Sequence, residues 1–233
     1  MIHSVAETGS TNDDMKALAA AGASEGSWLR ADRQTGGRGR SGRTWVSPPG
    51  NLYASTIVRL QAGDPPAPTL ALVAGLALFE AVRPCAGEGV RLKWPNDLHA
   101  GNRKLGGILL ERGDDVVVVG IGLNLAHHPD DADRPATSLS GEGWPHPSAD
   151  AMLANLAGHF FATLSTWRSE GLEVVRRAWI AAAHPIGTPL ATHGPDGSAL
   201  AGTFDGLDHD GACRLRLADG GVRLIHAGDV FLV

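Results

Sequence analysis

Cysteine is nearly absent from this chain of 233 residues, which contains only two. Cys85 and Cys213 lie far apart, and neither has a second cysteine two positions away. Such isolated thiols support neither a disulfide framework nor a zinc ribbon, and we expect both to be buried as small apolar side chains.

An excess of positive charge is also missing. The chain has 20 Lys and Arg against 25 Asp and Glu, which gives a formal net charge of −5. This balance argues against duplex DNA as the main ligand, because binding to a phosphate backbone relies on clustered cations. With 43% hydrophobic and 19% charged residues, the composition is that of an ordinary globular protein.

Long apolar runs are missing as well. No segment reaches the roughly 18 uninterrupted apolar residues of a membrane span, and the N-terminus has no basic stretch that leads into an apolar one. We therefore expect a cytoplasmic protein without a membrane partner. The length suits one large domain, or a main domain with a small appendage.

The patterns that are present predict an α+β main domain. The stretch after Ser10 is typical of a capped helix that ends near Gly22, and residues 69–83 are almost wholly apolar, as in a helix buried against a sheet. Helical spacing of apolar residues predicts a further helix over 152–167, continued over 172–183. Strands are expected at 27–32, 52–60, 90–94, 104–111 and 116–125. A turn at 113–115 joins the last two, so we expect a mixed, largely antiparallel sheet with packed helices.

The pattern changes near Pro185, after which glycines recur every few residues. Short runs punctuated by glycine predict a small β-barrel. We therefore place a main domain at residues 1–185 and a C-terminal barrel at 186–233. Residues 126–149, rich in His, Pro, Asp and Gly, are expected to form a long loop.

Three arginines interleaved with glycines mark the most distinctive segment. Residues 36–45 read GGRGRSGRTW and contain the pattern G-x-G-x-x-G. A dinucleotide site would need a helix to begin at these glycines, but the chain continues through Ser47-Pro48-Pro49-Gly50 into a strand. Arg38, Arg40 and Arg43 instead offer forked donors on a flexible backbone, which suits a phosphate together with a carboxylate. A solvated basic loop or an RNA-contacting tract is the alternative.

Two further regions could meet a ligand. The turn Lys93-Trp94-Pro95-Asn96-Asp97 gathers a cation, an aromatic ring, an amide and a carboxylate, although a structural turn with Trp94 in the core would have the same sequence. Lys104 stands before the pair Gly106-Gly107, and Gly120 and Gly122 lie on the next strand. These glycines outline a slot in which a ligand could approach the backbone, while structural bulges are the competing explanation.

Together these segments resemble the biotin protein ligase family. The resemblance rests on the loop G-R-G-R-x-G-R-x-W, on K-W-P-N-D, on R-K-x-x-G-I-L at 103–109 and on G-x-G-x-N at 120–124. Ser10-Thr11-Asn12 looks like the family's early S-T-N, and residues 202–208 look like part of its C-terminal barrel. The resemblance implies a class II synthetase-like biotin/lipoate ligase catalytic domain followed by an SH3-like barrel. It also implies the monofunctional type, without an N-terminal DNA-binding domain.

The resemblance further implies an ATP-dependent ligase that makes biotinyl-5'-AMP, releases pyrophosphate and transfers biotin to a lysine of a biotin carboxyl carrier domain. ATP with Mg²⁺ would be the co-substrate, and neither a prosthetic group nor a metal-binding side chain is expected. The protein would be a monomer or a homodimer that binds no DNA. Two alternatives stay open: a lipoate ligase, which shares the chemistry, and a noncatalytic biotin- or nucleotide-binding module, which would not need Lys104.

Carried over residue by residue, the resemblance assigns Lys104 and Arg40 to catalysis. It assigns biotin contacts to Ser10, Thr11, Asn12, Gln34, Gly37, Arg38, Gly39, Arg40, Lys104 and Gly107. It assigns nucleotide contacts to Arg40, Arg43, Trp45, Lys93, Asn96 and Asn124. Ser10 or Thr11 could instead cap the first helix. A metal site is a further alternative for His127, His128, Asp130, Asp131 and Asp133, although a solvated loop fits them better.

Overall fold

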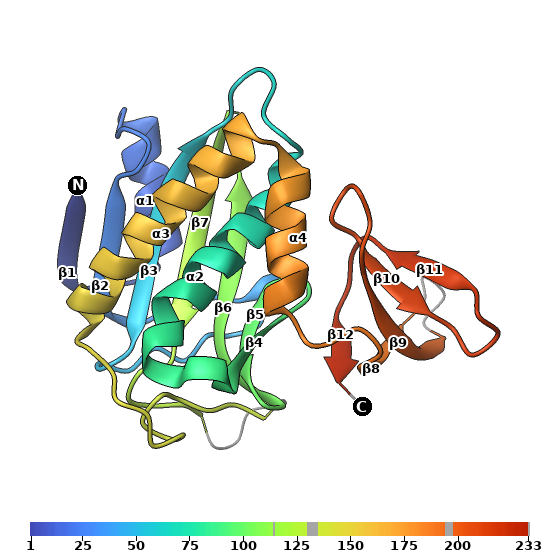
Figure 1. Cartoon of the computed structure of the whole chain (residues 1–233). Coiled ribbons are helices and arrows are strands. Elements are labelled where there is room, and N and C mark those ends of the chain that lie inside the picture. The colour runs from blue at the N-terminus through green and yellow to red at the C-terminus, as the bar shows by residue number, and fades with distance from the viewer. Residues whose placement is uncertain (114, 130–134, 194–197, 233) are drawn as a thin grey trace.

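The computed structural model describes residues 1–113, 115–129, 135–193 and 198–232. Among these residues, a large sheet has the strand order β1-β2-β3-β7-β6-β5-β4 (Figure 1). Its strands are β1 (Ile2–Thr8), β2 (Trp28–Gln34), β3 (Leu52–Arg59), β4 (Val90–Lys93), β5 (Asp97–Ala100), β6 (Arg103–Arg112) and β7 (Val116–Leu123). The helices are α1 (Thr11–Ala20), α2 (Leu70–Ala86), α3 (Ala149–Ser169) and α4 (Leu172–Ala182).

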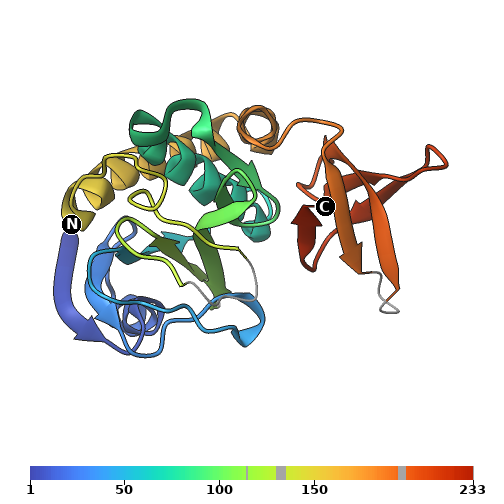
Figure 2. The same ribbon diagram turned by 90° about the horizontal axis from the view of Figure 1, so that it is seen from below.

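The large sheet is mixed in strand direction. β1 pairs with β2 in parallel, and the pairs from β2–β3 across to β5–β4 are antiparallel. α1 packs on one face of the sheet, and α2 and α3 cover the opposite face (Figures 1 and 2). The prediction of an α+β fold with a mixed, largely antiparallel sheet and packed helices is confirmed.

Coverage of both faces explains why the central strands are so apolar. β3 and β7 are buried along nearly their whole length. On one face Ile57 and Val118 pack with Met15 of α1, while Val58 and Val119 belong to the larger core on the other face. A strand enclosed on both sides carries apolar residues in an almost continuous run rather than in alternation.

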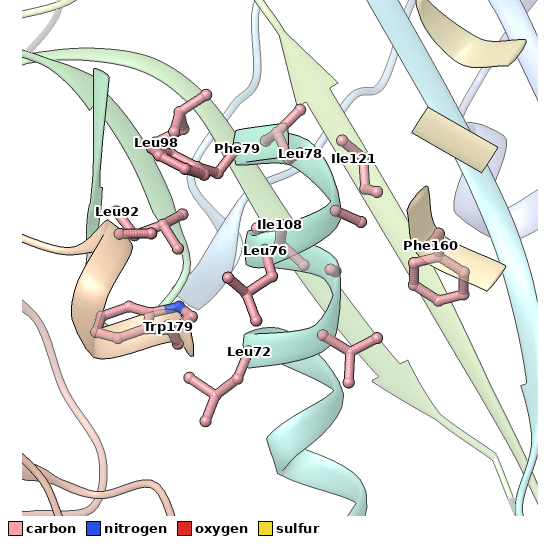
Figure 3. Packing of buried hydrophobic residues seen from close by; sticks show 14 of the residues in the cluster. Leu72, Leu76, Leu78, Phe79, Leu92, Leu98, Ile108, Ile121, Phe160 and Trp179 are labelled. Carbon is pink, nitrogen blue, oxygen red and sulfur yellow. The ribbon is translucent and has the colours of Figure 1, made fainter. Parts of the chain in front are cut away.

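α2 lies at the centre of the larger core, among Leu98, Ile108, Phe160 and Trp179 (Figure 3). By length and composition alone, the segment Ala67–Gly89 could cross a membrane, but 61% of its apolar window is buried inside the protein. Packing on both the sheet and the neighbouring helices accounts for that composition. A count of uninterrupted apolar residues does not detect this segment.

A smaller antiparallel sheet follows, with the strand order β11-β10-β9-β8-β12. Its strands are β8 (Pro189–His193), β9 (Ala199–Leu207), β10 (Cys213–Arg216), β11 (Val222–Ile225) and β12 (Val230–Leu232). We call this part the C-terminal module, residues 189–232. It stands beside the main sheet next to α4 (Figure 2). This second sheet is consistent with the predicted SH3-like barrel. The predicted boundary after residue 185 falls between α4 and β8, and as a division into domains it stays a prediction.

Aromatic side chains hold the C-terminal module against the main sheet. Phe204 meets Trp179 of α4 edge-on, with ring centroids 6.5 Å apart. The indole N–H of Trp94 donates a hydrogen bond to the Gly211 carbonyl at 3.0 Å. Trp94 is thus buried at the contact between the two sheets, as the alternative interpretation of its turn proposed. Cys213 is buried in the module, whereas Cys85 is only half-buried, and both thiols are free.

Two strands were not predicted, for different reasons. β1 lies at the edge of the large sheet and is exposed over all but its last residue, so its sequence IHSVAET carries no pattern of burial. β5 has only four residues and begins at Asp97, the last residue of K-W-P-N-D. That turn therefore joins β4 to β5 as a hairpin.

His184 lies where the chain passes from α4 to the C-terminal module. Its backbone N–H donates to the Leu92 carbonyl at 3.2 Å, and its ring faces His99 edge-on with centroids 6.1 Å apart. Burial, followed by the positive charges that His99, Lys93 and Arg91 can carry, lowers the pKa of His184 from 6.5 to about 4. The folded protein therefore favours the neutral ring.

This lowered pKa predicts a loss of stability in mild acid. Between pH 6.5 and about pH 4 the unfolded chain takes up a proton that folded His184 does not. The contribution of His184 to stability should be complete above pH 6.5 and decline as the pH falls toward 4. We expect the thermal midpoint to fall less between pH 7 and about pH 4.5 in His184→Gln than in the wild type. His209→Gln, at a ring whose side chain is 85% exposed, is the control and should follow the wild type. Equal falls in wild type and His184→Gln would contradict the prediction.

Candidate functional site

A cavity of about 540 Å³ lies between the large sheet, the arginine loop at residues 36–45 and the C-terminal module. α1, β5, β6, β7 and the turn that precedes β12 also contribute to its walls. Most of the predicted site residues line it: Ser10, Thr11, Asn12, Gln34, Arg38, Gly39, Arg40, Arg43, Trp45, Asn96, Lys104, Gly107 and Asn124. Segments that lie more than 100 residues apart in the chain therefore meet at one site.

A network of short polar side chains forms one end of the cavity. The Thr11 hydroxyl and backbone N–H both donate to Gln34 Oε1, at 3.1 and 2.9 Å. Ser55 Oγ lies 2.8 Å from Thr11 Oγ1 and 2.6 Å from Asn12 Oδ1. Asn12 Nδ2 donates to Glu111 at 2.6 Å. These bonds fix the orientation of the donors and acceptors that a ligand would meet there.

Ser10 precedes α1 at the N-cap position, which raised the question whether its hydroxyl serves the helix or a ligand. Its backbone has the extended conformation of a cap, but its side chain accepts no capping hydrogen bond within the described structure. Ser10 is buried and lines the cavity. The geometry therefore leaves its hydroxyl to the cavity rather than to the helix.

The predicted glycine slot holds side chains of the protein itself. A Cβ built on Gly122 would lie 2.6 Å from the Trp45 ring, and one on Gly120 would overlap Asn12. The missing side chains of β7 thus allow Trp45 and Asn12 to lie against the strand and to form part of the cavity wall. The indole Nε1 of Trp45 is buried without a partner in the described part of the chain.

The arginine loop is held at both ends by carboxylates. Arg38 donates to Asp13 of α1 at 2.6 Å, and this hydrogen bond lowers the pKa of Asp13 despite some burial. Arg43 makes a bidentate pair with Asp229 of the C-terminal module, at 2.9 and 3.1 Å. Between them Ser41 has a φ of 58°, a left-handed conformation that turns the loop. A single 3-10 turn, Arg40–Gly42, follows Gly39, but no α-helix begins at these glycines, in agreement with the rejection of a dinucleotide motif.

Asp97 lies behind Lys104 and pairs with two lysines. Lys104 Nζ donates to its Oδ1 at 2.5 Å, and Lys93 Nζ is 3.8 Å from its Oδ2. Burial alone would raise the pKa of Asp97, but Lys104, the neighbouring His99 ring and Lys93 together outweigh it and hold the pKa well below the usual 3.8. The carboxylate is therefore ionised at neutral pH and fixes Lys104, whose Nζ also lies 5.4 Å from the centroid of the Trp45 ring.

Lys93 and Gly37 do not line the cavity. Lys93 is buried, with its Nζ 3.8 Å from Asp97 Oδ2, and its contact with a nucleotide stays a prediction. The structure requires glycine at position 37, because a Cβ there would lie 2.7 Å from both Ser47 Oγ and Trp45 O. Its role is to let the arginine loop pass close to the segment that follows it.

The loop that includes residues 126–129 and 135–148 contributes Pro129 and Ala136 to the cavity wall and supports the neighbouring strands. Asn124 Nδ2 donates to the Thr137 carbonyl at 2.9 Å, and the Thr137 N–H donates to the Lys104 carbonyl at 2.9 Å. His128 Nδ1 lies 3.1 Å from Ser138 Oγ. The remaining residues of the alternative metal site, Asp130, Asp131 and Asp133, lie outside the described residues.

Sequence reasoning assigned no role to two carboxylates at this site. Asp97 is part of K-W-P-N-D, and its position four residues after Lys93 was the available signal. Asp229 lies 186 residues from Arg43 in the chain and has no motif around it, so only the tertiary structure identifies it. Ser55 lies at the centre of the polar network, but it could not be predicted as a site residue because it stands within a strand of buried residues.

Comparison with known proteins identifies the family of the chain. The model of the biotin/lipoate A/B protein ligase family matches residues 8–125. A biotin–[acetyl-CoA-carboxylase] ligase from Paracoccus denitrificans is 38% identical over 97% of this chain and 98% of its own. The corresponding ligase from Mycobacterium tuberculosis is 37% identical over 97% of this chain and 86% of its own.

Solved structures give the same result. The biotin protein ligase from Aquifex aeolicus in complex with biotin and ATP has a TM-score of 0.87 and 26% identity, covering 100% of this chain and 99% of its own. The biotin protein ligase from Leishmania major in complex with biotinyl-5-AMP has a TM-score of 0.68 and 29% identity, covering 97% and 98%. The chain belongs to the biotin/lipoate A/B protein ligase family and is a ligase enzyme.

Proposed function

We propose that this ligase activates biotin with ATP to biotinyl-5'-AMP and then transfers biotin to a lysine of a biotin carboxyl carrier domain. The single observation that carries the proposal is the cavity itself. At one end it has a preoriented polar network, and elsewhere it has arginines together with Lys104. A neutral, hydrogen-bonding ring and an anionic reaction centre could therefore occupy the same cavity.

The polar end suits the ureido ring of biotin. That ring has two N–H donors and one carbonyl acceptor, so a buried site must offer both acceptors and donors. Ser10, Thr11, Asn12 and Gln34 provide such groups, and the bonds to Ser55 and Glu111 keep them in place. The tetrahydrothiophene ring and the valeryl chain would then lie along Trp45, whose ring covers Gly122.

Activation brings two anions together. An oxygen of the biotin carboxylate attacks the α-phosphorus of ATP, a new P–O bond forms, and the bond to the departing pyrophosphate breaks. Lys104 and Arg40 are the catalytic groups in this proposal, because both line the cavity and can offset the repulsion between carboxylate and phosphate. Arg43, Trp45, Asn96 and Asn124 are assigned to the nucleotide and its surroundings, and Arg38 and Gly39 to the biotin side.

Mg²⁺ is assigned to the substrate, as MgATP. The carboxylates among the described lining residues are Asp97 and Asp229, and both already pair with cations. Mg²⁺ keeps several waters and binds mainly to substrate phosphates in such sites. The metal would neutralise the departing pyrophosphate, and we assign it no side-chain ligand.

In the second step the ε-amine of the acceptor lysine attacks the acyl carbonyl, an amide bond forms and AMP leaves. The acceptor class is supported by relatives named for acetyl-CoA carboxylase. We also propose a cytoplasmic location for the enzyme. In the described part of the chain, the one helix apolar and long enough to cross a membrane is 61% buried within its apolar window.

Mass spectrometry of the protein after incubation with ATP, Mg²⁺ and equal amounts of biotin and lipoate tests the proposal. We expect biotinyl-adenylate to be retained and lipoyl-adenylate to be absent. Lipoyl-adenylate as the main product would assign the chain to the lipoate-activating members of the family. A folded sample that binds biotin but yields neither adenylate would contradict the proposed activation step.

A further inference from the structure

Every cationic side chain that lines the cavity in the described structure already has a carboxylate partner. Arg38 pairs with Asp13, Lys104 pairs with Asp97, and Arg40 and Arg43 share Asp229. A ligand with several negative charges must therefore compete with carboxylates of the protein. The question is in which of these pairs a ligand anion can replace the carboxylate.

Asp97 and Asp229 differ in burial and in location. The side chain of Asp97 is 5% exposed and belongs to β5 of the main sheet, next to Lys104 on β6. The side chain of Asp229 is 27% exposed and belongs to the turn before β12 of the C-terminal module. If a ligand displaced Asp97 from Lys104, the Asp97 carboxylate would remain buried without this partner. Asp229 is partly exposed, so its displaced carboxylate can be hydrated at little cost in free energy.

The contacts of Asp229 are those that a phosphate would make. Its two carboxylate oxygens accept hydrogen bonds from the two terminal nitrogens of Arg43. Oδ1 also lies 3.8 Å from Arg40 Nη1. Arg40 also donates to the Gly228 carbonyl at 3.3 Å. A guanidinium presents its fork to a carboxylate or a phosphate in the same way, so one partner excludes the other.

We propose that Asp229 is an acidic latch, which holds the arginine loop through Arg43 and Arg40 in the ligand-free enzyme and is displaced by the nucleotide phosphates. This inference rests on the proposed function, because it takes the phosphates of ATP as the competing anion. Nucleotide binding then releases the turn at residues 226–229 from the loop. The C-terminal module thereby restrains the loop until ATP is present.

Asp229→Asn tests the latch, because it keeps the size of the side chain and removes its charge. Binding of ATP is measured by calorimetry with Mg²⁺ and biotinol, the alcohol analogue of biotin, which cannot form an adenylate. We expect the Kd for ATP to fall about fivefold in the variant, the size of effect expected for one part-exposed bidentate ion pair. In an Arg43→Ala background the same change should bring little gain.

Asp205→Asn is the matched control. Asp205 pairs with Arg214 and Arg216 in the same module, at 2.9 Å each, and does not line the cavity. It should leave the Kd for ATP unchanged. Thermal melting of both variants checks that the module remains folded.

Hydrogen–deuterium exchange follows the latch directly. Without ligand, exchange in residues 38–44 should be faster in Asp229→Asn than in the wild type. When ATP binds to the wild type, residues 38–44 should become protected while residues 226–229 exchange faster. Protection of both segments would mean that the ion pair persists with nucleotide bound, which would overturn the latch.

The two proposals fail in different ways. If the wild type binds ATP and Asp229→Asn binds it no more tightly, the latch is wrong and the proposed function stands. If the wild type binds no ATP in the presence of biotinol, the proposed function fails and the latch falls with it.

Discussion

Lys104→Ala is expected to lower the rate of adenylate formation by at least about 10²-fold. Lys104 lines the cavity beside Trp45 and is held by Asp97, so its ammonium stands where a carboxylate and a phosphate would approach each other. Removing a preorganised cation from such a site costs more in the transition state than in the ground state, because the attacking and transferring groups are closest there. Biotin binding without ATP should weaken far less than catalysis.

Pyrophosphate release, measured under single-turnover conditions, reports this rate. Arg103→Ala is the control, since Arg103 is the preceding residue, its side chain is 50% exposed and it pairs with Glu142 outside the cavity. Lys104→Gln keeps a hydrogen-bond donor without the charge and should be nearly as slow as Lys104→Ala. A rate within about threefold of wild type in both variants would falsify the catalytic assignment, because one charge-assisted contact is worth more than that.

Asp97→Asn is expected to damage both stability and activity. The substitution leaves Lys93 and Lys104 without their shared carboxylate, and the Lys93 side chain is only 8% exposed. Removing one partner of a buried ion pair costs about 3 kcal/mol or more of unfolding free energy. Urea denaturation at pH 7 measures this loss, at a pH where the lowered pKa of Asp97 keeps the wild-type carboxylate ionised.

The direction of the pH effect follows from the same pKa. The stabilising contribution of Asp97 should be complete above about pH 4 and disappear only in stronger acid, as the folded carboxyl takes up its proton. For the urea denaturation of Asp97→Asn, the control is Asp115→Asn, at a side chain that is 73% exposed. It should change the unfolding free energy by less than about 0.5 kcal/mol.

Asp97 acts through Lys104 in this account, and a double mutant separates that role from a purely structural one. Adenylate formation should be slow in Asp97→Asn, and adding Lys104→Ala should slow it little further. If the two changes multiply instead, Asp97 affects the reaction independently of Lys104. That outcome would contradict its role as a positioning residue.

Most of the residues that the sequence singled out line one cavity, but their environment could not be predicted. The arginine loop, K-W-P-N-D and the glycines of β6 and β7 could be identified because each has an unusual local composition. Their environment depends on which strands are neighbours. Gly122, for example, had been interpreted as space for a ligand, but a Cβ there would collide with Trp45.

Partners from distant segments could not be predicted. The sequence predicted that the arginines could bind an anion, but it did not show that Asp13 pairs with Arg38 and Asp229 with Arg43. The local sequence does not show which aspartate pairs with a distant arginine, because aspartate is common on any solvated segment. The same reason hid β1, whose exposed edge position removes the alternation that identifies a half-buried strand.

The sequence by itself determined the fold class, the family and most of the residues that line the cavity, because apolar periodicity and unusual local motifs survive without knowledge of the fold. Only the tertiary structure decided which carboxylate holds which cation, that Lys93 lies behind the cavity, and that the C-terminal module contributes Asp229 to its wall. Those relations depend on distances between segments far apart in the chain, and such distances are set by how the two sheets pack.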